Sequence, residues 1–76
     1  MPHVIVKMYP GRTEEQKQEL CSRMTEALME TLKVGVDSIS IGIEEISPEN
    51  WTEAVYKPDI LGKQETLYKK PGYQPK

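Results

Sequence analysis

The first 44 residues of the chain carry a pattern that few folds satisfy: an alternating segment, a long amphipathic segment and a second alternating segment. Residues 3–9 alternate with the period of a β-strand, placing Val4, Val6 and Met8 on one side, and Pro10-Gly11 ends the run. Residues 38–44 also alternate strictly, with isoleucine at every second position. We expect these isoleucines, Ile39, Ile41 and Ile43, to form a buried face.

The intervening residues predict one long helix, about residues 14–33. Thr13 suits the N-cap, and Gln16 stands three residues later, as a capping box requires. Lys33 lies near the C-terminal end, and we expect Gly35 to close the helix. The apolar positions recur with helical spacing and form one stripe: Leu20, Met24, Ala27, Leu28, Thr31 and Leu32. A strand, a helix and a strand predict an α+β fold built on a βαβ unit with parallel strands and a right-handed crossover.

The remaining residues are less regular, and we expect a single domain over residues 2–76. Residues 47–50 predict a turn that starts a short helical segment carrying Trp51, Val55 and Tyr56. Pro58 suits the first position of another helix, and Pro71-Gly72 ends it. That second helix is predicted to place five residues on one side: Ile60, Leu61, Gln64, Leu67 and Tyr68. The last residues are expected to fray or to dock on a neighbour.

A chain of this size and composition has too little core to be self-sufficient. It has 76 residues, of which 37% are hydrophobic, with no Phe and one Trp. One helix on two strands leaves the face with Ser38, Ser40 and Gly42 uncovered and both sheet edges unpaired. We therefore predict a homodimer, formed by sheet-to-sheet or edge-to-edge pairing.

Composition also argues against several classes of protein. A net charge of −2 argues against nucleic acid as a partner, and no apolar run approaches the roughly 20 residues that span a bilayer. One cysteine and one histidine argue against a disulfide framework and against a metal site within one chain. No secretory signal is visible, so we expect a cytoplasmic protein.

The feature most suggestive of chemistry is the second residue. A small residue after the initiator methionine favours removal of that methionine, which would leave Pro2 as a secondary amine at the start of a strand. Burial disfavours the ammonium form of such an amine and lowers its pKa toward neutrality, where a general base works well. The residues alone leave a second interpretation open, in which Pro2 is only a rigid start to the strand.

The chain resembles the 4-oxalocrotonate tautomerase family from Pro2 to about Trp51. The resemblance rests on Pro2, the run Gly11-Arg12-Thr13-Glu14-Glu15-Gln16-Lys17, the long helix and the strand from Ser38. The tail with Lys69-Lys70-Pro71-Gly72-Tyr73 is similar to that of short bacterial tautomerases that assemble as dimers. The resemblance implies two βαβ units that share a four-stranded sheet covered by two helices. It also implies a keto–enol tautomerase, an isomerase that acts on small 2-keto acids or their enols and needs no cofactor.

The same resemblance implies roles for particular residues. Pro2 matches the catalytic base, Arg12 matches an arginine that grips a substrate carboxylate with its planar fork, and Trp51 matches an aromatic wall. Ser40 stands where many family members carry a second arginine, and its neutral hydroxyl stabilises a developing enolate less. A monocarboxylate enol with an apolar or aromatic tail, such as an arylenolpyruvate, is therefore expected rather than a dicarboxylate.

His3, the only histidine, is interpreted as a structural strand residue, and a contribution from His3 or Lys7 to the site is left open. Two other functions remain. One is a dehalogenation, hydration or decarboxylation in which the prolyl ammonium acts as an acid. The other is a dimeric interaction module without catalysis. Mass spectrometry of the N-terminus discriminates, because a retained Met1 makes the Pro2 nitrogen an amide that cannot act as a base.

Overall fold

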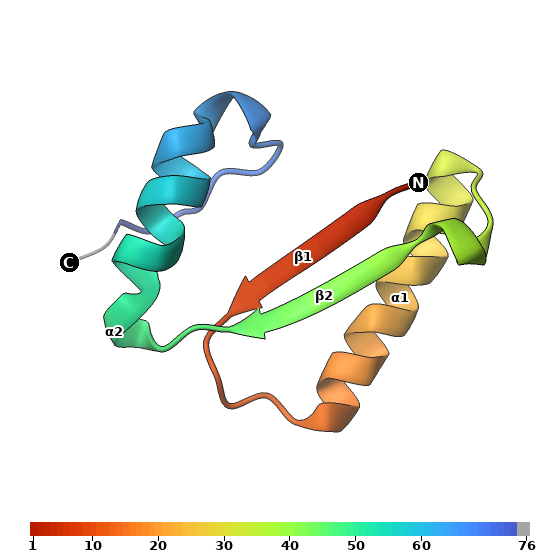
Figure 1. Cartoon of the computed structure of the whole chain (residues 1–76), viewed down its shortest axis with the longest axis horizontal. Helices are drawn as coiled ribbons and strands as arrows, with labels where there is room; N and C mark the ends of the chain where they lie inside the picture. The colour runs from red at the N-terminus through yellow and green to blue at the C-terminus, as the bar shows by residue number, and fades with distance from the viewer. Residues whose placement is uncertain (75–76) are drawn as a thin grey trace. The chain divides into compact units, whose positions relative to one another are not determined.

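The N-terminal part of the chain forms the predicted strand–helix–strand arrangement (Figure 1). The computed structural model describes residues 1–74 and separates the chain into two compact units, Met1–Glu45 and Ile46–Lys76. In the first unit β1 (His3–Met8), α1 (Glu14–Leu32) and β2 (Ser40–Glu45) follow one another. The two strands pair in parallel, with the first residue of β1 opposite the first residue of β2. The βαβ unit and the α+β class are thus confirmed, and a single domain stays a prediction.

Helix α1 begins as the sequence predicts and ends differently. The hydroxyl oxygen of Thr13 accepts a hydrogen bond from the Gln16 N–H at 3.1 Å, and the Gln16 amide oxygen accepts one from the Thr13 N–H at 2.9 Å. This completes the capping box. At the other end Lys33, rather than Gly35, is left-handed with φ 57°, and its N–H donates to the Met29 carbonyl. One residue with positive φ suffices to cap a helix, and Lys33 supplies it two residues earlier than expected.

Strand β2 begins later than the alternating pattern predicts. Residues 36–38 form a 3₁₀ turn, η1 (Val36–Ser38), and the strand starts only at Ser40. The N–H and the hydroxyl of Ser38 both donate to the Gly35 carbonyl, at 3.1 and 2.8 Å. A serine that bonds its own local backbone favours a turn over a β-ladder. Ser38 and Ile39 therefore precede the strand, contrary to our expectation.

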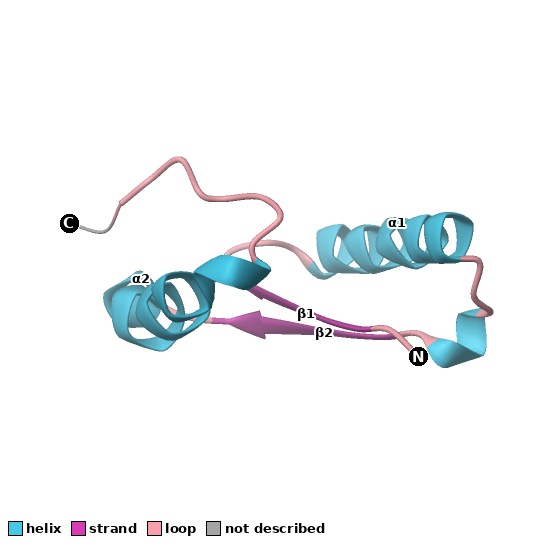
Figure 2. Ribbon diagram, turned by 90° about the horizontal axis from the view of Figure 1, so that it is seen from above, coloured by secondary structure: helices cyan, strands magenta, loops and turns pink. Residues whose placement is uncertain are grey.

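Helix α1 covers one face of the two-stranded sheet (Figure 2). The Lys17 ammonium on α1 lies 2.9 Å from the Glu45 carboxylate, so the side chain of Glu45 lies on the face of the sheet that α1 covers. The hydrogen bond with Glu45 raises the pKa of Lys17. By alternation, the face toward α1 carries Val4, Val6, Met8, Ile41 and Ile43. The opposite face carries His3, Ile5, Lys7, Ser40, Gly42 and Glu44.

The C-terminal unit is mostly one continuous helical segment (Figure 1). Helix α2 (Pro48–Trp51) passes directly into the π-helical stretch η2 (Thr52–Ile60), and the 3₁₀ stretch η3 (Leu61–Thr66) follows. The prediction that Pro58 begins a new helix is wrong, because Pro58 lies inside η2. In an α-helix a proline ring clashes with the carbonyl four residues earlier, and the wider π turn relieves this clash.

The prediction that five residues near the end of this segment share one side holds only in part. Leu61 is 51% exposed and Tyr68 fully exposed, whereas Ile60 and Leu67 are half-buried. A kink at Lys63, with φ −134° and ψ 37°, interrupts the helical periodicity between them. Residues 75–76, the end of the tail expected to fray or dock, lie outside the described residues.

Burial is sparse in both units. Among the described residues, the buried hydrophobic side chains are Val55 and Tyr56, both in the C-terminal unit. Helix α1 contains no buried residue, and Ile5 on the outer face of the sheet is 50% exposed. Within residues 1–74, no helix is long and apolar enough to cross a bilayer. Each unit thus has the thin core that the composition predicts.

Candidate active site

Pro2 and Ser40 meet at the end of the sheet where both strands begin. The N–H of Ser40 donates to the Pro2 carbonyl oxygen at 3.2 Å. Because the strands are parallel, their first residues lie at the same end of the sheet. Pro2 is half-buried there, and Ser40 is exposed. The structure thus brings together two of the four residues that the sequence assigns to the site.

His3, whose contribution to the site the sequence left open, joins this pair. Its ring nitrogen Nδ1 lies 2.6 Å from the Ser40 hydroxyl oxygen. The two residues are direct partners in the parallel register, so their side chains share the outer face of the sheet. Aligning the starts of two parallel strands would have found the contact, but only once the start of β2 was known.

Arg12 lies beyond the other end of β1. It follows Gly11, whose φ of 121° suits glycine, in the loop that leads away from the N-terminus before α1 returns (Figure 1). β1 has six residues, so at about 3.3 Å per residue its ends are roughly 20 Å apart. Arg12 is exposed and has no ion pair among the described residues, whereas Arg23 pairs with Glu19. One chain therefore does not bring Pro2 and Arg12 onto the same small substrate.

Trp51 lies in the C-terminal unit, where the end of the chain holds it. Its indole N–H donates to the Tyr73 hydroxyl at 2.9 Å. The Tyr73 ring also packs on Tyr56, with ring centroids 5.7 Å apart and planes inclined by 51°. Sequence reasoning missed Tyr73, because no spacing relates it to Trp51, 22 residues earlier. The role of Trp51 as a wall of the site stays a prediction.

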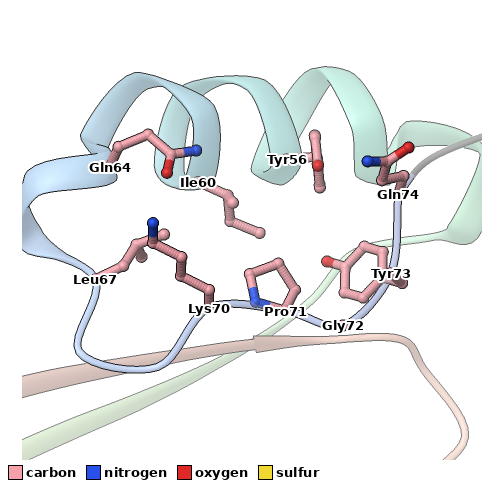
Figure 3. Close-up of a pocket in the computed structure, with 9 residues that line it drawn as sticks. All are labelled: Tyr56, Ile60, Gln64, Leu67, Lys70, Pro71, Gly72, Tyr73 and Gln74. Atoms are coloured by element: carbon pink, nitrogen blue, oxygen red, sulfur yellow. The ribbon is translucent and has the colours of Figure 1, made fainter.

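The C-terminal unit also contains an open pocket of about 380 Å³ (Figure 3). The helical segment forms one wall, and the returning chain from Lys70 to Gln74 forms the other. Its apolar lining comes mainly from Tyr56, Ile60, Leu67, Pro71 and Tyr73, and its polar lining from Gln64, Lys70 and Gln74. None of the four predicted site residues lines this pocket.

Known proteins resemble this chain over most of its length. The model of a family described as "Tautomerase enzyme" matches residues 2–55. A probable tautomerase of Xylella fastidiosa (strain 9a5c) is 40% identical over 73 residues, which cover 96% of this chain and 89% of that protein. The tautomerase PptA of Escherichia coli (strain SMS-3-5 / SECEC) is 39% identical over 74 residues, which cover 96% of this chain and 97% of that one.

A solved structure shows the same fold. The crystal structure of YwhB, described as a homologue of 4-oxalocrotonate tautomerase, superimposes with a TM-score of 0.60 and 45% sequence identity. The superposition covers 62% of this chain and 77% of YwhB. The family model begins at residue 2, whose carbonyl accepts the hydrogen bond from the Ser40 N–H.

Proposed function

This chain belongs to the tautomerase family, and we propose that it interconverts the enol and keto forms of a 2-keto acid with the amine of Pro2 as the general base. Family membership makes the protein a tautomerase, and hence an isomerase. The position of Pro2 supports its role as the proposed base. Pro2 directly precedes β1 and is half-buried, and its carbonyl accepts a hydrogen bond from the N–H of Ser40.

The amine acts at two atoms of the substrate. The neutral amine takes the proton of the enol hydroxyl, and the resulting ammonium delivers a proton to the carbon as the double bond moves to oxygen. This step needs the neutral amine, a form that burial of an amine nitrogen favours. Ser40 offers one neutral hydrogen bond to the oxygen, which is weak support for a doubly charged substrate. We therefore propose an enol with one carboxylate and an apolar or aromatic tail.

The substrate carboxylate binds Arg12 of the partner subunit in this proposal. Roughly 20 Å separates the two ends of β1, which is too far for one chain to supply both groups. β1 pairs with β2 on one side only, within the described residues. If two β1 strands pair antiparallel about a two-fold axis, the end of one lies beside the beginning of the other. The four-stranded sheet and homodimer expected from the sequence would thus complete the site.

Trp51 is the proposed apolar wall for the tail of the substrate. Its indole N–H is bonded to Tyr73, so its one polar atom already has a partner, and a role as a wall would rest on the apolar body of the ring. An aromatic tail matches such a surface better than a second carboxylate does. The cytosol remains the proposed location.

The test compares mature protein with a variant that keeps one extra residue before Pro2. Mass spectrometry should show that the mature chain begins at Pro2, and that chain should ketonise phenylenolpyruvate faster than buffer does. The rate should rise with pH as the prolyl ammonium loses its proton. The extended variant has an amide in place of the amine and should lose this activity. If the two proteins are equally active, Pro2 is not the base. If neither exceeds buffer, the proposed substrate class is wrong.

A further inference from the structure

His3 and Ser40 form a cross-strand pair at the end of the sheet where both strands begin, next to Pro2. The Nδ1 atom of His3 is 2.6 Å from the Ser40 hydroxyl oxygen. His3 directly follows Pro2, and the Ser40 N–H is bonded to the Pro2 carbonyl at 3.2 Å. The first register position of the sheet therefore pairs the imidazole with the hydroxyl, and the backbone bond from Ser40 holds Pro2 next to them.

Two proton arrangements satisfy the short contact, and they give Ser40 opposite properties. A serine hydroxyl has one hydrogen and two lone pairs. If Nδ1 accepts, the hydroxyl hydrogen points at the imidazole, and Ser40 offers only lone pairs to a substrate. If Nδ1 carries a hydrogen and donates, the contact occupies a lone pair, and the hydroxyl hydrogen is free for another acceptor. Which nitrogen of a histidine carries the proton is set by such a contact.

Only the second arrangement suits the reaction. When Pro2 takes the proton of the enol, negative charge develops on the substrate oxygen, and a donor stabilises it. A donor that itself accepts a hydrogen bond is polarised and donates more strongly. We infer that His3 is a positioning residue that donates from Nδ1 to Ser40, so that the Ser40 hydroxyl donates to the substrate oxygen. This inference rests on the proposed function and gives His3 a role that acts entirely through Ser40.

The kinetic test uses two substitutions of His3 that differ in a single property. His3→Asn places an amide N–H close to the position of Nδ1, and His3→Leu places a methyl group there. His3→Leu should lower kcat by about threefold to tenfold with little change in KM, because the lost hydrogen bond acts in the transition state. His3→Asn should stay within about twofold of the wild type. Thr31→Val, which removes a hydroxyl bonded to the Ala27 carbonyl on α1, is the control and should leave kcat unchanged.

A double-mutant cycle shows whether the effect passes through Ser40. In a Ser40→Ala background, His3→Leu should lower kcat by no more than about a further twofold. An equal fall in both backgrounds, or equal activities of His3→Asn and His3→Leu, would overturn the inference. If His3→Leu has no effect while the chain extended before Pro2 is inactive, the inference fails and the proposed function stands. If the extended chain is fully active, both fail.

Nuclear magnetic resonance provides a readout independent of turnover. His3 is the only histidine, so the ¹⁵N signals of its ring need no assignment strategy. At a pH where the imidazole is neutral, long-range ¹H–¹⁵N spectra should show the hydrogen on Nδ1. In Ser40→Ala this preference should be lost. A neutral ring with its hydrogen on Nε2 in the wild type would overturn the inference, because Nδ1 would then be an acceptor.

Discussion

Two variants that are each nearly inactive should restore activity when their subunits are mixed. One variant keeps an extra residue before Pro2, and the other is Arg12→Ala. Because roughly 20 Å separates the ends of β1, each site should combine Pro2 of one chain with Arg12 of the partner subunit. A mixed dimer then has one site with both groups intact and one site with neither.

The expected recovery follows from this geometry. Random pairing of equal amounts makes about half of the dimers mixed, and half of their sites are intact, so kcat/KM should reach about a quarter of the wild-type value. The Arg12→Ala parent loses a charge-assisted hydrogen bond worth about 1.5–3 kcal/mol, which lowers kcat/KM by about 10- to 150-fold. The recovered activity therefore stands clear of both parents.

The assay unfolds the two variants together and refolds them by dilution. Native mass spectrometry confirms the mixed dimers, and initial rates of enol ketonisation below KM give kcat/KM. As a control, the extended variant is mixed with a chain that carries both changes, which should restore nothing. If mixed dimers form but their activity does not exceed the mean of the parents, Pro2 and Arg12 act from the same chain, and the reasoning from strand length is wrong.

Three further predictions concern the dimer, the C-terminal unit and the pH range of stability. The Ser40 N–H is bonded to the Pro2 carbonyl, so the backbone of Val4 faces β2 and that of Ile5 faces the open edge. Ile5→Pro should therefore weaken the dimer at least about tenfold in sedimentation velocity and leave the unit folded, whereas Val4→Pro should unfold the unit in circular dichroism. An unaffected dimer in Ile5→Pro would contradict edge pairing. Tyr73→Phe keeps the ring on Tyr56 but removes the acceptor of the Trp51 N–H. It should lower the free energy of unfolding by about 0.5–1.5 kcal/mol in denaturant titrations followed by Trp51 fluorescence. An unchanged midpoint would refute a stabilising role for the hydrogen bond. The hydrogen bond with Glu45 raises the pKa of Lys17 above its ordinary value of 10.5, so the stabilisation from this pair is present below that value and is lost as the pH rises through the raised pKa. Wild type should melt at a slightly higher temperature than Lys17→Met at pH 8 and at the same temperature in strong alkali. A difference in melting temperature that grows with pH would contradict this reasoning.

The local features of the fold were predictable because their causes lie within a few residues of sequence. The capping box of Thr13 and Gln16 needs only two side chains three positions apart, and both of its hydrogen bonds form. Alternation over six residues placed the apolar side of β1, and the same periodicity placed the isoleucines of β2 on the covered face of the sheet. The parallel βαβ order then follows from the steric preference of the crossover.

Errors occurred where a local signal competed with another local bond or with a different helix geometry. Ser38 fits the alternation of β2, yet its hydroxyl and N–H bond the Gly35 carbonyl and extend the turn. Pro58 is a strong helix-start signal, but the π-helical stretch accommodates it in the interior. In both cases the preference of the residue type was real, but the conformation of the neighbouring backbone decided which structure formed.

The sequence by itself determined which residues are chemically suited to the site: a proline at position 2, one arginine after the first strand and a serine on the second. Only the tertiary structure decided which of them meet. Parallel pairing set His3 against Ser40 beside Pro2, and the length of β1 carried Arg12 away from them. The return of the chain brought Tyr73 to Trp51. The physical reason is that a side-chain contact depends on register and on distance through space, and neither is encoded by spacing along the chain.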